Sequence, residues 1–264
     1  MTGMKQRRFI AAAVITAAAL LSGCTSGGAA SESAKPAVDA PLRATATAPL
    51  LSPAPAAAPV YVSIPHQAPV SSGILPGAEV DILRDGHLYG CTLGPAMRQT
   101  TTGKTGFLTA GHCAGTASVD GVVLGPVEEV ADTHAECGCK SIPGELAGTA
   151  EDVGIIWTDA AETAGTIAGH PVAGAMSETE LGALPEGTPV CALGSTTGSW
   201  CTDFYGADIF IGAGGGDHGD SGAAMFVVDD NGNATLIGIA SDVGGGSILG
   251  RAMNRIHLVP VTAA

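Results

Sequence analysis

The chain has 264 residues, of which 39 are glycine, 16 are proline and only 14% are charged. This composition excludes a coiled coil, a collagen and a charge-rich disordered protein. Acidic residues outnumber basic residues by 25 to 11, which gives a net charge of −14. Because nucleic-acid binding needs clustered Lys and Arg to neutralise phosphates, nucleic acid is excluded as a partner.

The first residues have the pattern of an export signal. A basic start is followed by an uncharged run of 13 residues, Phe9–Leu21, whereas a membrane-spanning helix needs about 20. The run leads into Leu-Ser-Gly-Cys, which resembles the lipobox of bacterial lipoproteins. This resemblance implies that residues 1–23 are a signal peptide and that Cys24 is lipidated, so that the protein is tethered to a membrane of the bacterial cell envelope or secreted. An ordinary cleaved signal, with Cys24 incidental, is the alternative.

The next segment, residues 24–73, is predicted to be a disordered tether. It contains eight of the 16 prolines, many alanines and few charged side chains. Such a segment cannot bury enough surface to offset the entropy that is lost on ordering. The folded domain is therefore predicted to begin at Ile74 and to occupy residues 74–264.

Residues 74–264 are predicted to form an all-β domain. Turn signals such as Asp85-Gly86, Asp120-Gly121 and Asn231-Gly232 separate short β-prone runs, and no long segment has a helical period. Many short strands at near-regular spacing are typical of a β-sandwich or a barrel. The predicted strands are Ala78–Leu83, His87–Leu93, Gly106–Thr109, Gly121–Leu124, Val153–Trp157, Val190–Leu193, Ala207–Ile211, Ala223–Val228, Thr235–Ala240 and Ile256–Val261.

Three short segments carry groups suited to nucleophilic catalysis. His112 lies in Thr-Ala-Gly-His-Cys, Ser221 lies in Gly-Asp-Ser-Gly, and Asp152 begins the apolar run Asp-Val-Gly-Ile-Ile-Trp. A serine hydroxyl is a weak nucleophile until a base takes its proton, and that base needs a carboxylate to orient it. The three residues are therefore candidates for nucleophile, general base and orienting acid.

Other residues compete for the role of the acid. Asp120, Asp132 and Asp159 also lie between the histidine and the serine in the chain. Only Asp152 is followed by an apolar strand that could bury it. We therefore expect Asp152 to be the orienting carboxylate.

Two further arrangements of chemical groups deserve comparison with this one. The order Ser221, Asp242, His257 is that of α/β-hydrolases, but Ala223 breaks the Gly-x-Ser-x-Gly elbow which that fold requires. The cluster of His134 with Cys137 and Cys139 could suggest a metal site. Four ligands with convergent spacing are not evident there, so no metal and no other cofactor is predicted.

The motifs around His112 and Ser221, in the chain order His, Asp, Ser, resemble those of the chymotrypsin-fold serine endopeptidases. The segment Cys191–Cys201 resembles a disulfide-closed hairpin of the secreted streptogrisin-like enzymes of actinobacteria. The resemblance covers residues 74–264. It implies two six-stranded antiparallel β-barrels of the trypsin-like kind, with the active site between them.

The resemblance also implies roles for individual residues. Ser221 would be the nucleophile, His112 the general base and then the general acid, and Asp152 the orienting carboxylate. The backbone N–H groups of Gly219 and Ser221 would form the oxyanion hole. Ser241 would support Asp152 from the floor of the crevice.

A primary substrate pocket is implied as well. Gly215 would lie at its base, and Ser241, Asp242 and Val243 would form its wall. Because the base carries no acidic side chain, the expected preference is for uncharged, apolar residues of medium size. Asp217 lies nearby and could alter this preference.

The cysteines fit an oxidising compartment. If Cys24 carries lipid, six cysteines remain, and this even number fits three disulfides. The resemblance implies that Cys91 pairs with Cys113 and that Cys191 pairs with Cys201. Cys137 and Cys139 are then left as a third bridge or as free thiols.

Asp220, next to the nucleophile, raises the question of how the site is switched on. In the family this carboxylate is buried beneath the oxyanion hole, and a buried charge needs a partner. Streptogrisin-like relatives supply an arginine where this chain has Ala192. The predicted substitutes are an internal base, chosen from His218, Arg251 and Arg255, or a new amine made by cutting at Gly73–Ile74. Because Pro76 stiffens the start of the domain, the internal base is favoured.

The predicted function is that of a monomeric serine endopeptidase acting on protein or peptide substrates. The alternative is a weakly active or non-catalytic surface-binding protein on the same fold. The alternative draws on the glycine-rich stretch Gly212–Gly216, which lacks a cysteine bridge that the family often has. Glycine loses the most backbone entropy on ordering, so a pocket built on this stretch could stay unformed without substrate.

Overall fold

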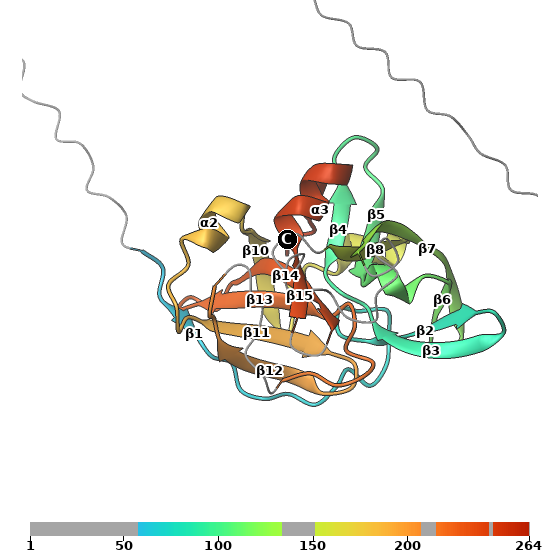
Figure 1. The fold of residues 1–264 in the computed structure, drawn as a ribbon, viewed down its shortest axis with the longest axis horizontal. Coiled ribbons are helices and arrows are strands. Elements are labelled where there is room, and N and C mark those ends of the chain that lie inside the picture. Colours follow the sequence, from blue (N-terminus) through green and yellow to red (C-terminus); the bar gives the residue numbers. More distant parts are fainter. Residues whose placement is uncertain (1–57, 134–150, 207–214, 243–244, 264) are drawn as a thin grey trace, which may run out of the picture. The chain divides into compact units, whose positions relative to one another are not determined.

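Two β-sheets make up most of the regular structure in the computed structural model (Figure 1). The structure describes residues 58–133, 151–206, 215–242 and 245–263. The all-β prediction is confirmed, and the two largely antiparallel sheets are consistent with the expected pair of trypsin-like barrels. Each sheet has eight hydrogen-bonded strands rather than the expected six.

The first sheet contains most of the strands between residues 79 and 157 and the last strand of the chain. Its strands follow the order β16-β4-β5-β8-β7-β6-β2-β3, and every neighbouring pair is antiparallel. The strands are β2 (Glu79–Arg84), β3 (His87–Thr92), β4 (Ala96–Gln99), β5 (Thr105–Thr109), β6 (Thr116–Val119), β7 (Val122–Asp132), β8 (Asp152–Trp157) and β16 (Leu258–Pro260).

The second sheet follows the order β12-β11-β13-β14-β10-β9, with β1 added beside β13 and β15 beside β14. Its pairs are antiparallel except for β10 and β14, which run parallel. The strands are β1 (Tyr61–Val62), β9 (Thr166–Ile167), β10 (His170–Ala175), β11 (Pro189–Gly194), β12 (Gly198–Asp203), β13 (Ala224–Asp229), β14 (Ala234–Asp242) and β15 (Gly245–Ile248).

Two predicted turns show how local sequence sets the register of the first sheet. Asp85 and Gly86, between β2 and β3, have φ angles of 53° and 78°. Asp120 and Gly121, between β6 and β7, have φ angles of 51° and 78°. Positive φ at both central residues matches the right-handed twist of the flanking strands, which is why Asp-Gly pairs favour tight hairpins.

Helices are short and few in the described residues. They are η1 (Gly111–Cys113), η3 (Asp159–Thr163), α2 (Glu178–Gly182) and α3 (Leu249–Ile256). The predicted strand Ile256–Val261 is wrong at its start, because Ile256 ends α3 and the strand is β16. None of the helices in the described part of the chain is long and apolar enough to cross a membrane.

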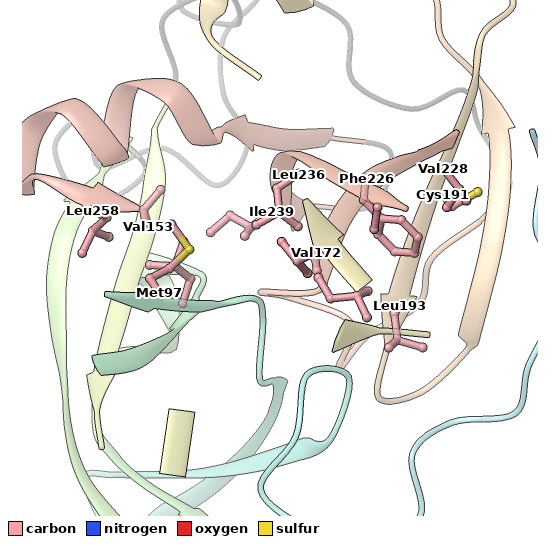
Figure 2. Close-up of a cluster of buried hydrophobic side chains, with 14 of the residues drawn as sticks. Met97, Val153, Val172, Cys191, Leu193, Phe226, Val228, Leu236, Ile239 and Leu258 are labelled. Atoms are coloured by element: carbon pink, nitrogen blue, oxygen red, sulfur yellow. The ribbon is translucent and has the colours of Figure 1, made fainter. Parts of the chain in front are cut away.

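A continuous hydrophobic core joins the two sheets (Figure 2). Aliphatic side chains dominate it, as the low aromatic content of the sequence requires, and Phe226 is its buried aromatic residue. Because the sheets share this core, groups at their junction are held by both. Figure 2 shows the cluster running from the first sheet to the second through Leu258, Met97, Val153, Ile239, Leu236, Val172 and Phe226.

The folded domain begins earlier than the sequence predicted. Residues 58–73, which we call the leading segment, were expected to belong to the disordered tether, but they lie along the second sheet. Strand β1 pairs with β13, and Ile64 is only 8% exposed within the shared core. The amide of Gln67 donates to Oγ of Ser199 (2.7 Å), and the amide of Ser199 donates to the carbonyl of Gln67 (3.0 Å). A boundary at Ile74 is therefore wrong, and the ordered part of the domain reaches back at least to residue 58.

The predicted signal peptide, residues 1–23, lies outside the described residues, as do Cys24 and the part of the tether up to residue 57. The predicted strand Ala207–Ile211 also falls outside them.

Candidate active site

The structure brings His112, Asp152 and Ser221 into one hydrogen-bonded chain at the junction of the two sheets. His112 lies in η1, directly after β5, Asp152 begins β8, and Ser221 lies just before β13. Nδ1 of His112 is 2.6 Å from Oδ2 of Asp152, and Nε2 of His112 is 3.0 Å from Oγ of Ser221. The order of contacts is that of a nucleophile, a base and an orienting acid.

Asp152 is fixed by more than the imidazole. The residue is almost fully buried, at 2% exposed, and its Oδ1 accepts a hydrogen bond of 2.7 Å from the backbone amide of His112. The hydroxyl of Ser241, in β14, donates to Oδ2 at 2.5 Å. Ser241 thus contacts the aspartate as the resemblance implied.

These contacts decide the charge of the buried carboxyl group. Burial raises the pKa of Asp152, but the hydrogen bond and charge of the His112 ring and the hydroxyl of Ser241 lower it by more. The net pKa of Asp152 therefore lies below its ordinary value. The group is ionised at neutral pH and stabilises a protonated imidazole.

The competing acid Asp120 takes part in a different contact. Its carboxylate accepts a hydrogen bond from the amide of Gly73 (2.8 Å), at the end of the leading segment. Ser221 likewise contacts the imidazole of His112 rather than that of His257. The α/β-hydrolase arrangement is therefore not formed.

A cleft of about 490 Å³ opens beside Ser221 and His112. The Cys91–Cys113 disulfide and residues of the β2–β3 hairpin line part of the cleft. Arg84, in β2, donates from Nη1 to the carbonyl oxygen of His112 (3.0 Å) and lies over the ring of Tyr89, 4.9 Å from its centroid. His112 and Ser221 therefore both lie on the wall of this cleft.

Two backbone amides at the cleft are candidates for an oxyanion hole. Within the described residues, neither the N–H of Gly219 nor that of Ser221 donates to another group of the protein. The neighbouring amides are used, since that of Asp220 donates to Asp217 and that of Gly222 to Ala240. Two unpaired donors beside a nucleophile are what a developing oxyanion requires.

The residues predicted for the substrate pocket are only partly described. Asp242 lies in β14 and Val243 outside the described residues, and the side chains of both are outside them. Gly215 lies against the indole of Trp200, and a Cβ at Gly215 would overlap that ring. The space at the predicted base of the pocket is therefore filled by Trp200, which sequence reasoning missed.

Two of the predicted disulfides are present. Cys91 is bonded to Cys113 beside His112, and Cys191 is bonded to Cys201 across β11 and β12. Cys137 and Cys139 lie outside the described residues, as does His134. Disulfides are compatible with an extracytoplasmic or secreted protein.

One group of three potential metal ligands occurs among the described residues, Cys91, His112 and Cys113. Its two sulfur atoms are joined to each other, so neither is a thiolate that could bind a metal. The imidazole is engaged by Asp152 and Ser221.

Within the described residues no base contacts Asp220, so His218 and Arg255 are wrong as its expected partner, and the side chain of Arg251 lies outside those residues. Asp220 is 3% exposed, and its carboxylate accepts hydrogen bonds from the amides of Thr196 (2.8 Å) and Thr197 (3.2 Å), the hydroxyl of Thr197 (2.7 Å) and the amide of Asp217 (2.9 Å). All four donors are uncharged. Arg255 instead pairs with Glu151.

The sequence does contain a signal for these donors. Thr196 and Thr197 stand in the middle of the recognised hairpin motif, and hydroxyl residues in turns commonly bond to nearby backbone or side chains. Trp200 stands beside Cys201 in the same motif. Its position against Gly215 depends on how two distant segments pack, and this packing cannot be predicted from the local sequence.

No protein-family model and no curated protein matches this chain. One solved structure that is similar to this one is that of a glutamic acid-specific serine protease, described as using a histidine triad in substrate binding. The two chains are 21% identical, with a TM-score of 0.42, and the match covers 71% of this chain and 100% of the other.

Proposed function

We propose that this chain is a serine endopeptidase that hydrolyses peptide bonds through Ser221, His112 and Asp152. One observation carries the proposal: Ser221, the imidazole of His112 and a buried carboxylate form a continuous hydrogen-bonded chain that opens on a cleft. A buried carboxylate aligned in this way activates a serine through histidine.

In the first half of the reaction, Nε2 of His112 takes the hydroxyl proton of Ser221 while Oγ attacks the carbonyl carbon of the substrate. The carbonyl oxygen becomes an oxyanion and accepts hydrogen bonds from the amides of Gly219 and Ser221. Asp152 stays ionised and stabilises the imidazolium. His112 then gives its proton to the amine of the leaving peptide, the C–N bond breaks, and an acyl-enzyme ester remains on Ser221.

In the second half, water replaces the leaving peptide. His112 takes a proton from the water, whose oxygen attacks the ester carbon through a second oxyanion. The ester bond breaks, the proton returns to Oγ of Ser221, and the acid product leaves. The triad and both amides belong to one chain, so the proposed enzyme acts as a monomer and uses no cofactor.

We extend the proposal to side-chain preference. The indole of Trp200 lies against Gly215, and a broad apolar surface at the base of a pocket favours uncharged side chains of medium size. Profiling with a peptide library tests this preference. Trp200→Ala should shift cleavage toward larger apolar residues, whereas a dominant preference for Arg or Lys would contradict the assignment.

We also propose that the enzyme is tethered to the cell envelope through a lipid on Cys24. The support is the Leu-Ser-Gly-Cys motif after an apolar run of 13 residues. Palmitate labelling of cells that express the full chain tests this. Label should appear on the wild type and be absent from Cys24→Ala, while label on both would place the lipid elsewhere.

Hydrolysis itself is tested with a denatured protein substrate and mass spectrometry of the new termini. The wild type should cut the substrate, and Ser221→Ala and His112→Ala should abolish the cutting. His87→Ala changes an exposed histidine on β3 and serves as the matched control. If a folded wild type produces no new termini in the substrate, a non-catalytic binding protein would be the better hypothesis.

A further inference from the structure

Asp220 is a buried anion that four neutral groups hold in place. Three of the four donors belong to the turn between β11 and β12. They are the amides of Thr196 and Thr197 and the hydroxyl of Thr197. Since each carboxylate oxygen already accepts two hydrogen bonds, neither a cation nor a freed amine is needed to satisfy the group. The turn therefore supplies hydrogen bonds to Asp220 in the absence of an ion pair among the described residues.

The same turn fixes the direction of an oxyanion-hole amide. The hydroxyl of Thr196 donates to the carbonyl oxygen of His218 at 2.8 Å. That carbonyl and the N–H of Gly219 belong to one peptide group, which is planar and trans. Because C=O and N–H point in opposite directions across such a group, holding the His218 oxygen on the turn directs the Gly219 N–H away from it.

The next peptide group is held by two more hydroxyls. The carbonyl of Gly219 accepts hydrogen bonds from Oγ1 of Thr92 (2.8 Å) and Oγ of Ser195 (2.9 Å). Gly219 itself has a φ of +100°, and a Cβ there would overlap Oγ1 of Thr196. The loop before Ser221 is therefore fixed at two successive peptide groups, and it needs glycine at this position.

The turn is itself anchored. It joins β11 and β12, which pair from Pro189↔Asp203 to Gly194↔Gly198 and are linked by the Cys191–Cys201 disulfide. A Cβ at Gly194 would overlap the carboxylate of Asp220. Glycine here lets the hairpin approach Asp220 closely enough to donate its amides.

We propose that Thr196 and Thr197 are positioning residues that hold the oxyanion hole formed through neutral hydrogen bonds, so that the enzyme is assembled for catalysis without a cut at Gly73–Ile74. The inference rests on the proposed peptidase function and adds to it how the site is kept active. Thr196 also lines the cleft, but the role proposed here does not require either threonine to contact substrate. They act through His218, Gly219 and Asp220.

The test compares four variants of the full chain: Thr196→Val, Thr197→Val, Thr196→Ser and Thr197→Ser. Each valine variant keeps the shape but loses the hydroxyl, and should lower kcat by about tenfold to a hundredfold with little change in KM, somewhat less than outright loss of an oxyanion donor. Each serine variant keeps the hydroxyl and should stay within about threefold of the wild type. Thr102→Val is the matched control, because Thr102 lies in the exposed β4–β5 turn.

A second readout does not depend on activity. Hydrogen exchange of the peptide that contains residues 215–222 should be faster in both valine variants than in the wild type, the serine variants and Thr102→Val. Unchanged exchange and unchanged kcat in the valine variants would overturn the role of the turn, even if the wild type cuts peptides. A wild type that is inert while the valine variants speed exchange would overturn the peptidase but not the role of the turn.

The independence from cleavage is measured on protein whose Gly73–Ile74 bond mass spectrometry shows to be intact. Such protein should have full activity. Activity that appears only after this bond is cut would overturn the inference.

Discussion

Ile64 distinguishes an ordered leading segment from a disordered tether. In a tether, truncating this side chain would leave the free energy of unfolding unchanged. In the structure, Ile64 is 8% exposed and packs in the core that joins the two sheets. Ile64→Ala should therefore destabilise the domain.

The magnitude follows from the contacts of the residue. Truncation of a buried isoleucine to alanine costs about 2–5 kcal/mol, depending on how far the cavity collapses. The segment lies at the edge of the core and can relax, so we expect a value near the lower end, about 2–3 kcal/mol. For a domain of about 200 residues this corresponds to a fall in Tm of about 4–12 °C.

Urea unfolding followed by near-UV circular dichroism measures the change. Val60→Ala is the matched control, since Val60 lies in the same segment but is 60% exposed, and it should change the free energy of unfolding by less than about 0.5 kcal/mol. Ser199→Ala, which removes the hydroxyl that binds Gln67, should cost about 1–3 kcal/mol. Equal stabilities of Ile64→Ala and Val60→Ala would refute the ordered segment.

Three further predictions concern the triad. The kcat/KM should rise with pH as His112 loses its proton and then level off, since only a neutral imidazole accepts the proton of Ser221; a profile that is flat from acid to mild alkali would count against the base. Ser241→Ala should lower kcat/KM by roughly tenfold or more, because a hydrogen bond to a charged group contributes about 1.5–3 kcal/mol, and an unchanged rate would show that the hydroxyl does not support Asp152. Because the pKa of Asp152 is lowered in the fold, its stabilising effect is complete above its unfolded pKa of about 3.9 and is lost as the pH falls through the lower folded value. Urea unfolding below about pH 4 should therefore show a weaker pH dependence in Asp152→Asn than in the wild type, and identical slopes would contradict the lowered pKa.

The parts of the fold that were predictable from sequence are those set by local chemistry. Asp85-Gly86 and Asp120-Gly121 adopt positive φ at both residues, and this alone places tight hairpins between β2 and β3 and between β6 and β7. The geometry of His112 and Ser221 could be expected because each lies in a short motif. Asp152 could be identified because its apolar strand buries it.

The parts that could not be predicted depend on partners distant in the chain. The leading segment is rich in proline and has no period, so composition indicates disorder. It is nevertheless ordered, because its backbone binds Ser199 and Ile64 enters the core. The composition of a segment does not show which distant residues it will contact in the fold.

Asp220 was misread for a related reason. The positions of Lys, Arg and His in a sequence indicate only the cations that could pair with a buried carboxylate. Amides and hydroxyls of a turn can also satisfy the carboxylate, but they are uncharged and do not alter the charge pattern. Four such donors satisfy this carboxylate. Trp200 against Gly215 is a third case, since the contact joins segments that only the tertiary fold brings together.

Reaction of the protein with a fluorophosphonate probe tests most directly whether Ser221 is an activated nucleophile. The probe phosphonylates a serine only when a base has activated it, and peptide mapping identifies the modified residue. We predict stoichiometric labelling of the wild type at Ser221, slower labelling as the pH falls and His112 becomes protonated, and none in Ser221→Ala or His112→Ala. A folded wild type that stays unlabelled at neutral pH, or that is labelled at another residue, would contradict the account.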